Sequence, residues 1–215
     1  MRGTCISLLA AAALSMLSLI AVAQDTAAVA VQLEPRHRPV LTNARVRVLD
    51  IRIPAGDKSL MHTHEHDAVH ITVQGARIRE TKPRGWWVSM HDASADGLTY
   101  FSALRGTPCT HAIENIGERA TRIVAIELLE SASAGHEAAA LDGAVAIADN
   151  PRVRVDRLEA AVTPQLPALR AQALSVTPGP SQVDGQNLAP GSALWTEPGQ
   201  ARRLESGQFI LVQLK

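Results

Sequence analysis

Four closely spaced histidines offer the clearest chemistry in this chain. They are half of its eight histidines and fall within nine residues, at His62, His64, His66 and His70. Alternate side chains of an extended strand point to the same face, so this spacing predicts a column of imidazoles along one strand. Such a column is costly in a dry core, but neutral imidazole is a preferred ligand for zinc, iron, copper and nickel. The spacing favours a metal site, and an exposed polar strand edge is the alternative.

Short strands separated by turns must position these side chains. Apolar and charged residues alternate over residues 46–53 and 77–79, and glycine and proline mark turns at 54–56, 83–85 and 105–108. Antiparallel β-sandwiches and barrels show this pattern. We therefore predict an all-β fold in which the histidine strand belongs to a small barrel.

The histidines and the glycines around them resemble the motifs of the cupin superfamily. Its first motif has a glycine, five residues, His-x-His and a later glycine, and its second ends in a histidine with an asparagine four residues on. The matching positions are Gly56, His62, His64 and Gly75, and then His111 and Asn115. The resemblance covers roughly residues 43–130. It implies a cupin β-barrel, the double-stranded β-helix or jelly roll, with a divalent metal held by His62, His64 and His111.

The chain departs from the cupin pattern at two positions. Ala68 stands where the family places a metal-binding glutamate, and Gly106 precedes His111 by five residues rather than three. The resemblance then implies a three-histidine site without a carboxylate, similar to that of cupin thiol dioxygenases, which would bind an anionic substrate more readily. His70 follows Ala68 by two residues and is a candidate fourth ligand or general base. A cavity-lining histidine is the alternative.

Four further residues lie next to the motif histidines. Cupin chains bend after the second histidine, which leaves open whether His66 points to the ligands. Glu65 and Asp67 are expected to point away from them. Cys109 lies two residues before His111 and is either a reactive thiol or a small buried residue.

The remaining candidates lie around the expected pocket. Asn115 is expected to tie down a turn with its side chain. Strand alternation points one of Trp86 and Trp87 inward. Trp87 and Tyr100 are therefore candidates either to fill the core or to form a wall of the pocket. The histidines expected in solvated loops are His37, His91 and His136.

An internal repeat divides the chain into two units. Asn43-Ala-Arg-Val-Arg-Val and Asn150-Pro-Arg-Val-Arg-Val agree at five of six positions. Repeats of this kind predict tandem structural units. We expect an N-terminal arm at 24–42, a metal-binding cupin domain at 43–130, a linker at 131–149 with a short helix over 136–141, and a shorter degenerate cupin-like unit at 150–215. The second unit contains no histidine, so it is expected to stabilise or dimerise the protein rather than bind metal.

The first 23 residues have the layout of a secretory signal peptide. A positive start precedes the apolar run Ile6 to Val22, and Ala21-Val22-Ala23 forms a small-x-small cleavage site. A membrane anchor is the alternative, although the run is at the short end for spanning. Cleavage would leave Cys109 as the only cysteine, excluding an intramolecular disulfide. We therefore expect a periplasmic or secreted protein that does not stay in the membrane.

Charge and composition narrow the function. Lysine plus arginine and aspartate plus glutamate number 21 each, and aromatic residues make up only 3%, so a nucleic-acid partner is not expected. The first hypothesis is an exported cupin-type protein that binds iron, manganese, zinc, nickel or copper and acts on a small molecule, as a dioxygenase-like oxidoreductase or else in isomerisation or hydrolysis. The second is a non-catalytic periplasmic module for a metal or small ligand. The third is a structural homodimer that retains ancestral histidines.

Overall fold

The computed structural model describes residues 27–83, 87–93, 96–130, 135 and 137–215, without the side chains of 87–93. The predicted signal peptide, residues 1–23, lies outside this range. The described chain is β throughout apart from short 3₁₀ turns, such as η1 (Val31–Leu33). Among the described residues there is no helix long and apolar enough to cross a membrane.

The first half of the chain folds into two five-stranded sheets. In spatial order, one sheet contains β1 (Val29–Ala30), β4 (His62–His64), β9 (Cys109–Asn115), β6 (Ala76–Thr81) and β7 (Trp87–Ala93). The other contains β2 (His37–Thr42), β3 (Val46–Ile53), β10 (Thr121–Leu128), β5 (Ala68–Gln74) and β8 (Thr99–Ser102). We call these two sheets the first barrel.

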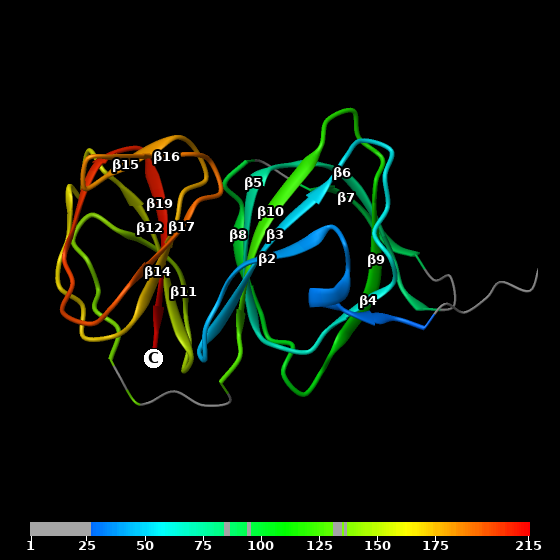
Figure 1. The fold of residues 1–215 in the computed structure, drawn as a ribbon, viewed down its shortest axis with the longest axis horizontal. Coiled ribbons are helices and arrows are strands. Elements are labelled where there is room, and N and C mark those ends of the chain that lie inside the picture. Colours follow the sequence, from blue (N-terminus) through cyan, green and yellow to red (C-terminus); the bar gives the residue numbers. More distant parts are fainter. Residues whose placement is uncertain (1–26, 84–86, 94–95, 131–134, 136) are drawn as a thin grey trace, which may run out of the picture.

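The second half repeats the two-sheet arrangement with shorter strands, and we call it the second barrel. One sheet contains β11 (Val145–Asp149), β12 (Val153–Glu159), β19 (Gln208–Leu214), β14 (Ala173–Val176) and β17 (Ala193–Thr196). The other contains β13 (Gln165–Leu166), β18 (Arg202–Ser206), β15 (Ser181–Val183) and β16 (Gln186–Leu188). Figure 1 shows the two barrels side by side, with β11 and β14 of one near β2 and β8 of the other.

The sequence repeat has a physical basis in a shared turn. The Asn43 side-chain oxygen accepts hydrogen bonds from the backbone N–H groups of Arg45 and Val46. Asn150 does the same for Arg152 and Val153. Asparagine side chains commonly stabilise a turn in this way. The same kind of turn thus precedes β3 in the first barrel and β12 in the second, and each of these strands belongs to the longest strand pair of its barrel.

Strand alternation gives β3, β5 and β10 two different buried faces. Val48, Val69 and Ile126 join one apolar cluster with Val155 and Val212 of the second barrel. The intervening residues of the same strands point into the first barrel, where Leu49, Ile51, Ile53 and Ala125 pack together. A sheet buried on both faces needs apolar residues in near-continuous runs. β10 has such a run from Ile123 to Ile126, whereas charged residues interrupt β3.

The predicted N-terminal arm supplies two strands of the first barrel. β1 pairs in parallel with β4, with Val29 opposite His62. β2 pairs antiparallel with β3, with His37 opposite Ile51. The segment before residue 43 is therefore part of the barrel wall next to the histidines.

The predicted linker also contains regular structure. Its described residues 137–141 are irregular, so a helix there is wrong over that range, and His136 lies outside the described residues. β11 lies within the predicted linker and pairs antiparallel with β12. The second barrel therefore begins earlier than the repeated sequence at Asn150.

Candidate metal centre

The histidine stretch forms two strands, so the prediction of one continuous column is wrong, and the bend after the second histidine that the cupin resemblance implied is present. β4 ends at His64 and β5 begins at Ala68, and the two strands belong to different sheets. Residues 65–67 make the bend between them. His62 and His64 therefore face His70 across the barrel interior instead of standing beside it.

The three histidines of the cupin pattern lie together. β4 and β9 pair antiparallel, which sets His62 opposite His111. The ring centroid of His62 lies 5.1 Å from that of His64 and 4.7 Å from that of His111, and the His64 and His111 centroids are 5.1 Å apart. Both β4 histidines are buried. Alternation along one short strand and pairing with the next therefore bring these rings to a common space.

His70 lies at the edge of this group. Its ring centroid is 6.2 Å from that of His64. It stacks on Tyr100 of β8 at 4.9 Å with an interplanar angle of 13°, because β5 and β8 pair with these two residues opposite each other. Ala68 is fully buried on the same strand.

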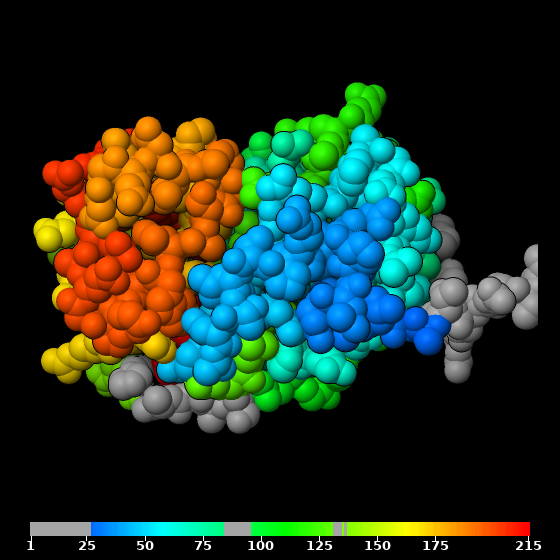
Figure 2. Space-filling view, in the orientation of Figure 1, coloured from blue at the N-terminus to red at the C-terminus, as the bar shows by residue number. Residues whose placement is uncertain are grey.

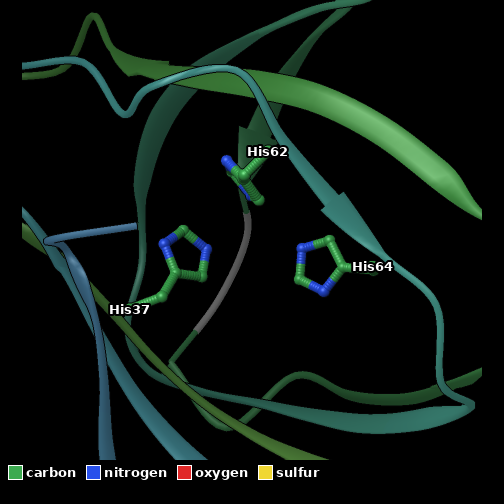
Figure 3. Close-up of side chains that lie close together, drawn as sticks. All are labelled: His37, His62 and His64. Carbon is green, nitrogen blue, oxygen red and sulfur yellow. The ribbon is translucent and has the colours of Figure 1, made fainter. Parts of the chain in front are cut away.

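A fifth histidine, His37, joins the cluster, so the expectation that it is solvated in a loop is wrong. It begins β2, is only 2% exposed, and its ring centroid lies 4.3 Å from that of His62 and 5.8 Å from that of His64. One ring nitrogen from each of these three residues lies within 4.8 Å of the others. Figure 3 shows the three rings around a common space.

Hydrogen bonds turn several of these rings toward the common space. His62 Nδ1 donates to the Leu60 carbonyl at 2.8 Å, and His37 Nδ1 donates to Glu34 Oε2 at 2.6 Å. His111 Nδ1 lies 2.8 Å from Glu80 Oε1. We assign the proton to Nδ1 in each case because the partner oxygen can only accept. Each Nε2 then carries a lone pair, as a metal ligand requires.

Three buried ring nitrogens have no hydrogen-bond partner in the described part of the chain. His62 Nε2 and His64 Nδ1 belong to the cluster, and His66 Nδ1 lies outside it. A buried polar atom left unpaired costs about 1–3 kcal/mol, so these atoms need an explanation. A divalent ion between the His37, His62 and His64 rings, whose ring nitrogens lie within 4.8 Å of one another, would use the lone pair of His62 Nε2, and the donor set fits a metal.

Burial keeps most of the cluster neutral. It lowers the pKa of His62 to about 3 and that of His70 to about 4, and it lowers the pKa of His64 further still. The neighbouring imidazoles act in the same direction. His111 differs: burial opposes its charge, but the hydrogen bonds with Cys109 and Glu80 raise its pKa overall. Neutral imidazoles are the form that binds metal.

A cavity of about 180 Å³ adjoins the cluster. His37, His64, His70 and His111 line it together with Glu80 and Tyr100. The rest of the described wall is mainly isoleucine, from Ile51, Ile53, Ile78, Ile113 and Ile123. Small-molecule sites commonly combine such an apolar wall with a few polar groups at one end.

Cys109 belongs to a charged group behind His111. Lys82 Nζ donates to Cys109 Sγ at 3.0 Å and lies 2.5 Å from Glu80 Oε1. Hydrogen bonding with His111 and then with Lys82 lowers the pKa of the Cys109 thiol to about 7, against the effect of burial. The ligand atoms of Glu80, Cys109 and His111 are close enough for a metal, but the Lys82 ammonium already supplies a cation there.

The other predicted residues lie outside the cluster. Asn115 donates to the carbonyls of Ile53 and Arg119 and accepts from the Gly117 N–H, which ties the end of β9 to a turn. His66 lines a separate small cavity with Arg47 and Glu127.

Two flanking acids also lie away from the rings. Glu65 is exposed, and Asp67 is buried and binds Arg152 of the second barrel. The side chains of Trp87 and His91, like all of Trp86, lie outside the described residues.

Comparisons with known proteins support the fold. No protein-family model matches the chain, and no curated protein matches its sequence. Its structural neighbours include a cupin domain from Bordetella pertussis Tohama I, 24% identical over 43% of this chain and 90% of that one, with a TM-score of 0.37. YhhW from Escherichia coli is 12% identical over 84% and 88% of the two chains, with a TM-score of 0.51. A salicylate 1,2-dioxygenase from Pseudaminobacter salicylatoxidans is 12% identical over 84% and 76%, with a TM-score of 0.49.

The chain is a cupin-fold protein of the all-β class. The prediction of a cupin β-barrel fold, made from His62, His64 and His111, agrees with the two-sheet barrels and with the fold of YhhW. At such low identities the likeness concerns the fold alone.

Proposed function

We propose that the first barrel binds one divalent first-row transition metal and acts on a small molecule in the adjoining cavity. His62 and His64 are the central ligands, and His111 is the predicted third. The observation that supports this most is the group of buried rings His37, His62 and His64, whose ring nitrogens lie within 4.8 Å of one another, together with the unpartnered His62 Nε2. The metal could be iron, manganese, zinc, nickel or copper, since all accept imidazole.

The proposed chemistry is that of a dioxygenase-like oxidoreductase. When held by His62, His64 and His111, a redox-active ion would supply Lewis-acid and one-electron chemistry to a small molecule in the cavity. The five isoleucines give the cavity a largely apolar wall. Burial lowers the pKa of His70 to about 4 and keeps it neutral near pH 7, so it lines the cavity as an uncharged imidazole that can hydrogen-bond a bound substrate. Stacking on Tyr100 fixes the orientation of this ring.

We also propose that the protein is exported. The signal-peptide layout of residues 1–23 supports this. Expression of the full chain in a Gram-negative host, followed by fractionation and intact mass measurement, tests it. A periplasmic product beginning at Gln24 is expected, and a cytoplasmic product of full length would contradict export.

A non-catalytic metal-binding or ligand-binding module is the second candidate. The observation in its favour is the number of imidazoles: His37 and His70 lie close to the three predicted ligands. Five imidazoles can fill a coordination sphere and leave no position open for a substrate. Catalytic sites, by contrast, retain an open position.

Elemental analysis and spectroscopy test both proposals. The purified protein is reconstituted anaerobically with iron, manganese, zinc, nickel or copper in turn, and about one equivalent of at least one metal is expected to remain bound. His62→Ala is expected to lose it, while His66→Ala, outside the cluster, is the matched control. Retention of no metal by the wild type would overturn metal binding. A metal spectrum that dioxygen and small organic acids leave unchanged, with no product, would favour the non-catalytic module.

A further inference from the structure

The N-terminal segment holds a buried carboxylate against the histidine cluster. The Glu34 side chain is inaccessible to solvent. Its Oε2 atom accepts hydrogen bonds from His37 Nδ1 at 2.6 Å and from the Arg36 N–H at 2.7 Å. Its Oε1 atom accepts from the Leu60 N–H at 3.1 Å. A buried carboxylate is costly unless it is well paired, and Glu34 meets that condition with three donors.

The same carboxylate reaches two rings of the cluster. It contacts His37 directly. It also fixes Leu60, whose carbonyl accepts the Nδ1 proton of His62 at 2.8 Å. Glu34 therefore orients the His37 ring directly, and it orients the His62 ring indirectly through the backbone of Leu60.

His37 is oriented as a ligand rather than as a structural histidine. Its Nδ1 proton is engaged by Glu34, which leaves the lone pair on Nε2. Its ring lies closer to His62 than any other imidazole does, at 4.3 Å between centroids. It also belongs to the group whose ring nitrogens lie within 4.8 Å of one another.

From this geometry we infer that His37 is a metal ligand and that Glu34 is the carboxylate that positions it. The inference rests on the proposed metal site. A carboxylate hydrogen-bonded to a liganding histidine orients the ring and raises its basicity. The chain has Ala68 where a carboxylate ligand is expected, so the negative charge reaches the metal through one imidazole instead of directly.

The N-terminal segment is then part of the metal site. Two pairings hold it there: β1 lies parallel to β4, and β2 antiparallel to β3. The Arg36 guanidinium adds two hydrogen bonds to Asp57, at 2.8 and 2.6 Å. Figure 2 shows this segment, in blue, on the surface of the first barrel against its cyan strands. The cluster is complete only with this segment in place.

The test measures zinc affinity by chelator competition and records the visible spectrum of the cobalt(II) form. Variants His37→Ala, His37→Gln and Glu34→Gln are compared with the wild type and with His66→Ala. Loss of His37 is expected to weaken zinc binding on the order of 100-fold and to shift the cobalt spectrum. Glu34→Gln, which keeps the side-chain shape, is expected to weaken zinc binding about 10-fold or more.

The outcomes separate this inference from the metal site itself. A wild type that binds neither zinc nor cobalt would overturn the proposed function and the inference together. The inference alone would be overturned if the His37 variants kept the wild-type zinc affinity and cobalt spectrum while His62→Ala no longer bound metal. Circular dichroism and thermal unfolding of the metal-free proteins identify any variant that has merely unfolded. If His37→Ala fails that control, the volume-conserving His37→Gln decides the question.

Discussion

The two barrels share a turn and a strand register but fill their interiors differently. Ala125 of β10 lies opposite His70 in the first barrel, and Leu211 of β19 lies opposite Ser175 at the equivalent place in the second. The first barrel thus combines a large polar ring with a small neighbour, and the second combines a small polar residue with a large apolar one. This difference in side-chain size helps to leave room for imidazoles inside the first barrel, whereas large apolar side chains fill the interior of the second.

The difference extends to the strands that carry the ligands. β4 contributes His62 and His64. The corresponding strand of the second barrel, β13, contributes Leu166 instead. Leu166, Leu204, Phe209 and Leu211 pack into one buried cluster of the second barrel. A site of unpaired imidazoles costs stability, while a close-packed apolar core supplies it. A separate apolar cluster joins the two barrels. It is formed by the sheet of β3, β10 and β5 in the first barrel and the sheet of β12, β19 and β14 in the second.

The largest expected effect is the loss of metal from the first barrel. His64→Ala removes a buried, proposed ligand, so we expect metal content to fall from about one equivalent to near zero, measured by elemental analysis after dialysis. Ser175→Ala, at the place equivalent to His70 in the second barrel, is the comparison and is expected to retain the metal. Equal losses in both variants would mean that the two interiors do not differ as described.

Removing core volume from the second barrel tests the other half of the comparison. Phe209 is fully buried, and Phe209→Ala is expected to lower the free energy of unfolding by about 3–5 kcal/mol. Denaturant titration measures this change. The folded variant is expected to keep its metal, because Phe209 belongs to the apolar cluster of the second barrel and the proposed ligands belong to the first. Metal loss from the folded variant would show that the second barrel takes part in the site.

Low pH is expected to destabilise the metal-free protein through the first barrel. The folded pKa of His62 is about 3 and that of His70 is about 4, below the ordinary value of 6.5. The unfolded chain therefore binds more protons between pH 6.5 and about 3–4, and stability falls as pH falls through this window. At pH 5 each of these histidines contributes about 2 kcal/mol of destabilisation.

Urea titrations of the metal-free protein between pH 7.5 and 4.5 measure this slope. His111 acts in the opposite sense, because its raised pKa makes its contribution present at low pH and lost as pH rises. His62→Gln is expected to flatten the slope. A slope that stays the same in this variant would mean that groups other than the histidine cluster set the pH dependence.

The smallest expected effect concerns the turn that the barrels share. Asn43→Ala and Asn150→Ala each remove two hydrogen bonds to backbone N–H groups. We expect each to cost about 1–2 kcal/mol of unfolding free energy, measured by thermal or chemical denaturation. Similar costs would support equivalent turns. A neutral result at Asn150 alone would show that the second barrel does not depend on its turn.

Much of the fold was predictable because its signals are local. Glycine and proline turns, alternating strands and the repeated Asn-x-Arg-Val-Arg-Val segment are all properties of neighbouring residues. The cupin motif is a local signal too, because the positions of His62 and His64 depend on one strand and on the turn before it. The mistakes came where the chain changes sheets. The bend at residues 65–67 separated His66 and His70 from that strand, and nothing in the even spacing reveals it.

His37 shows the limit most clearly. Its position depends on pairing with Ile51 and on the parallel contact between β1 and β4, which are not encoded in the spacing of the residues around it. The one local signal was the acid three positions earlier, Glu34, and an isolated Glu-x-x-His is too common to carry weight. By itself, the sequence determined an all-β repeat with a histidine motif in its first half, because turns and alternation act over a few residues. Tertiary structure alone decided which histidines meet, because strands distant along the chain must pair before their side chains share an interior.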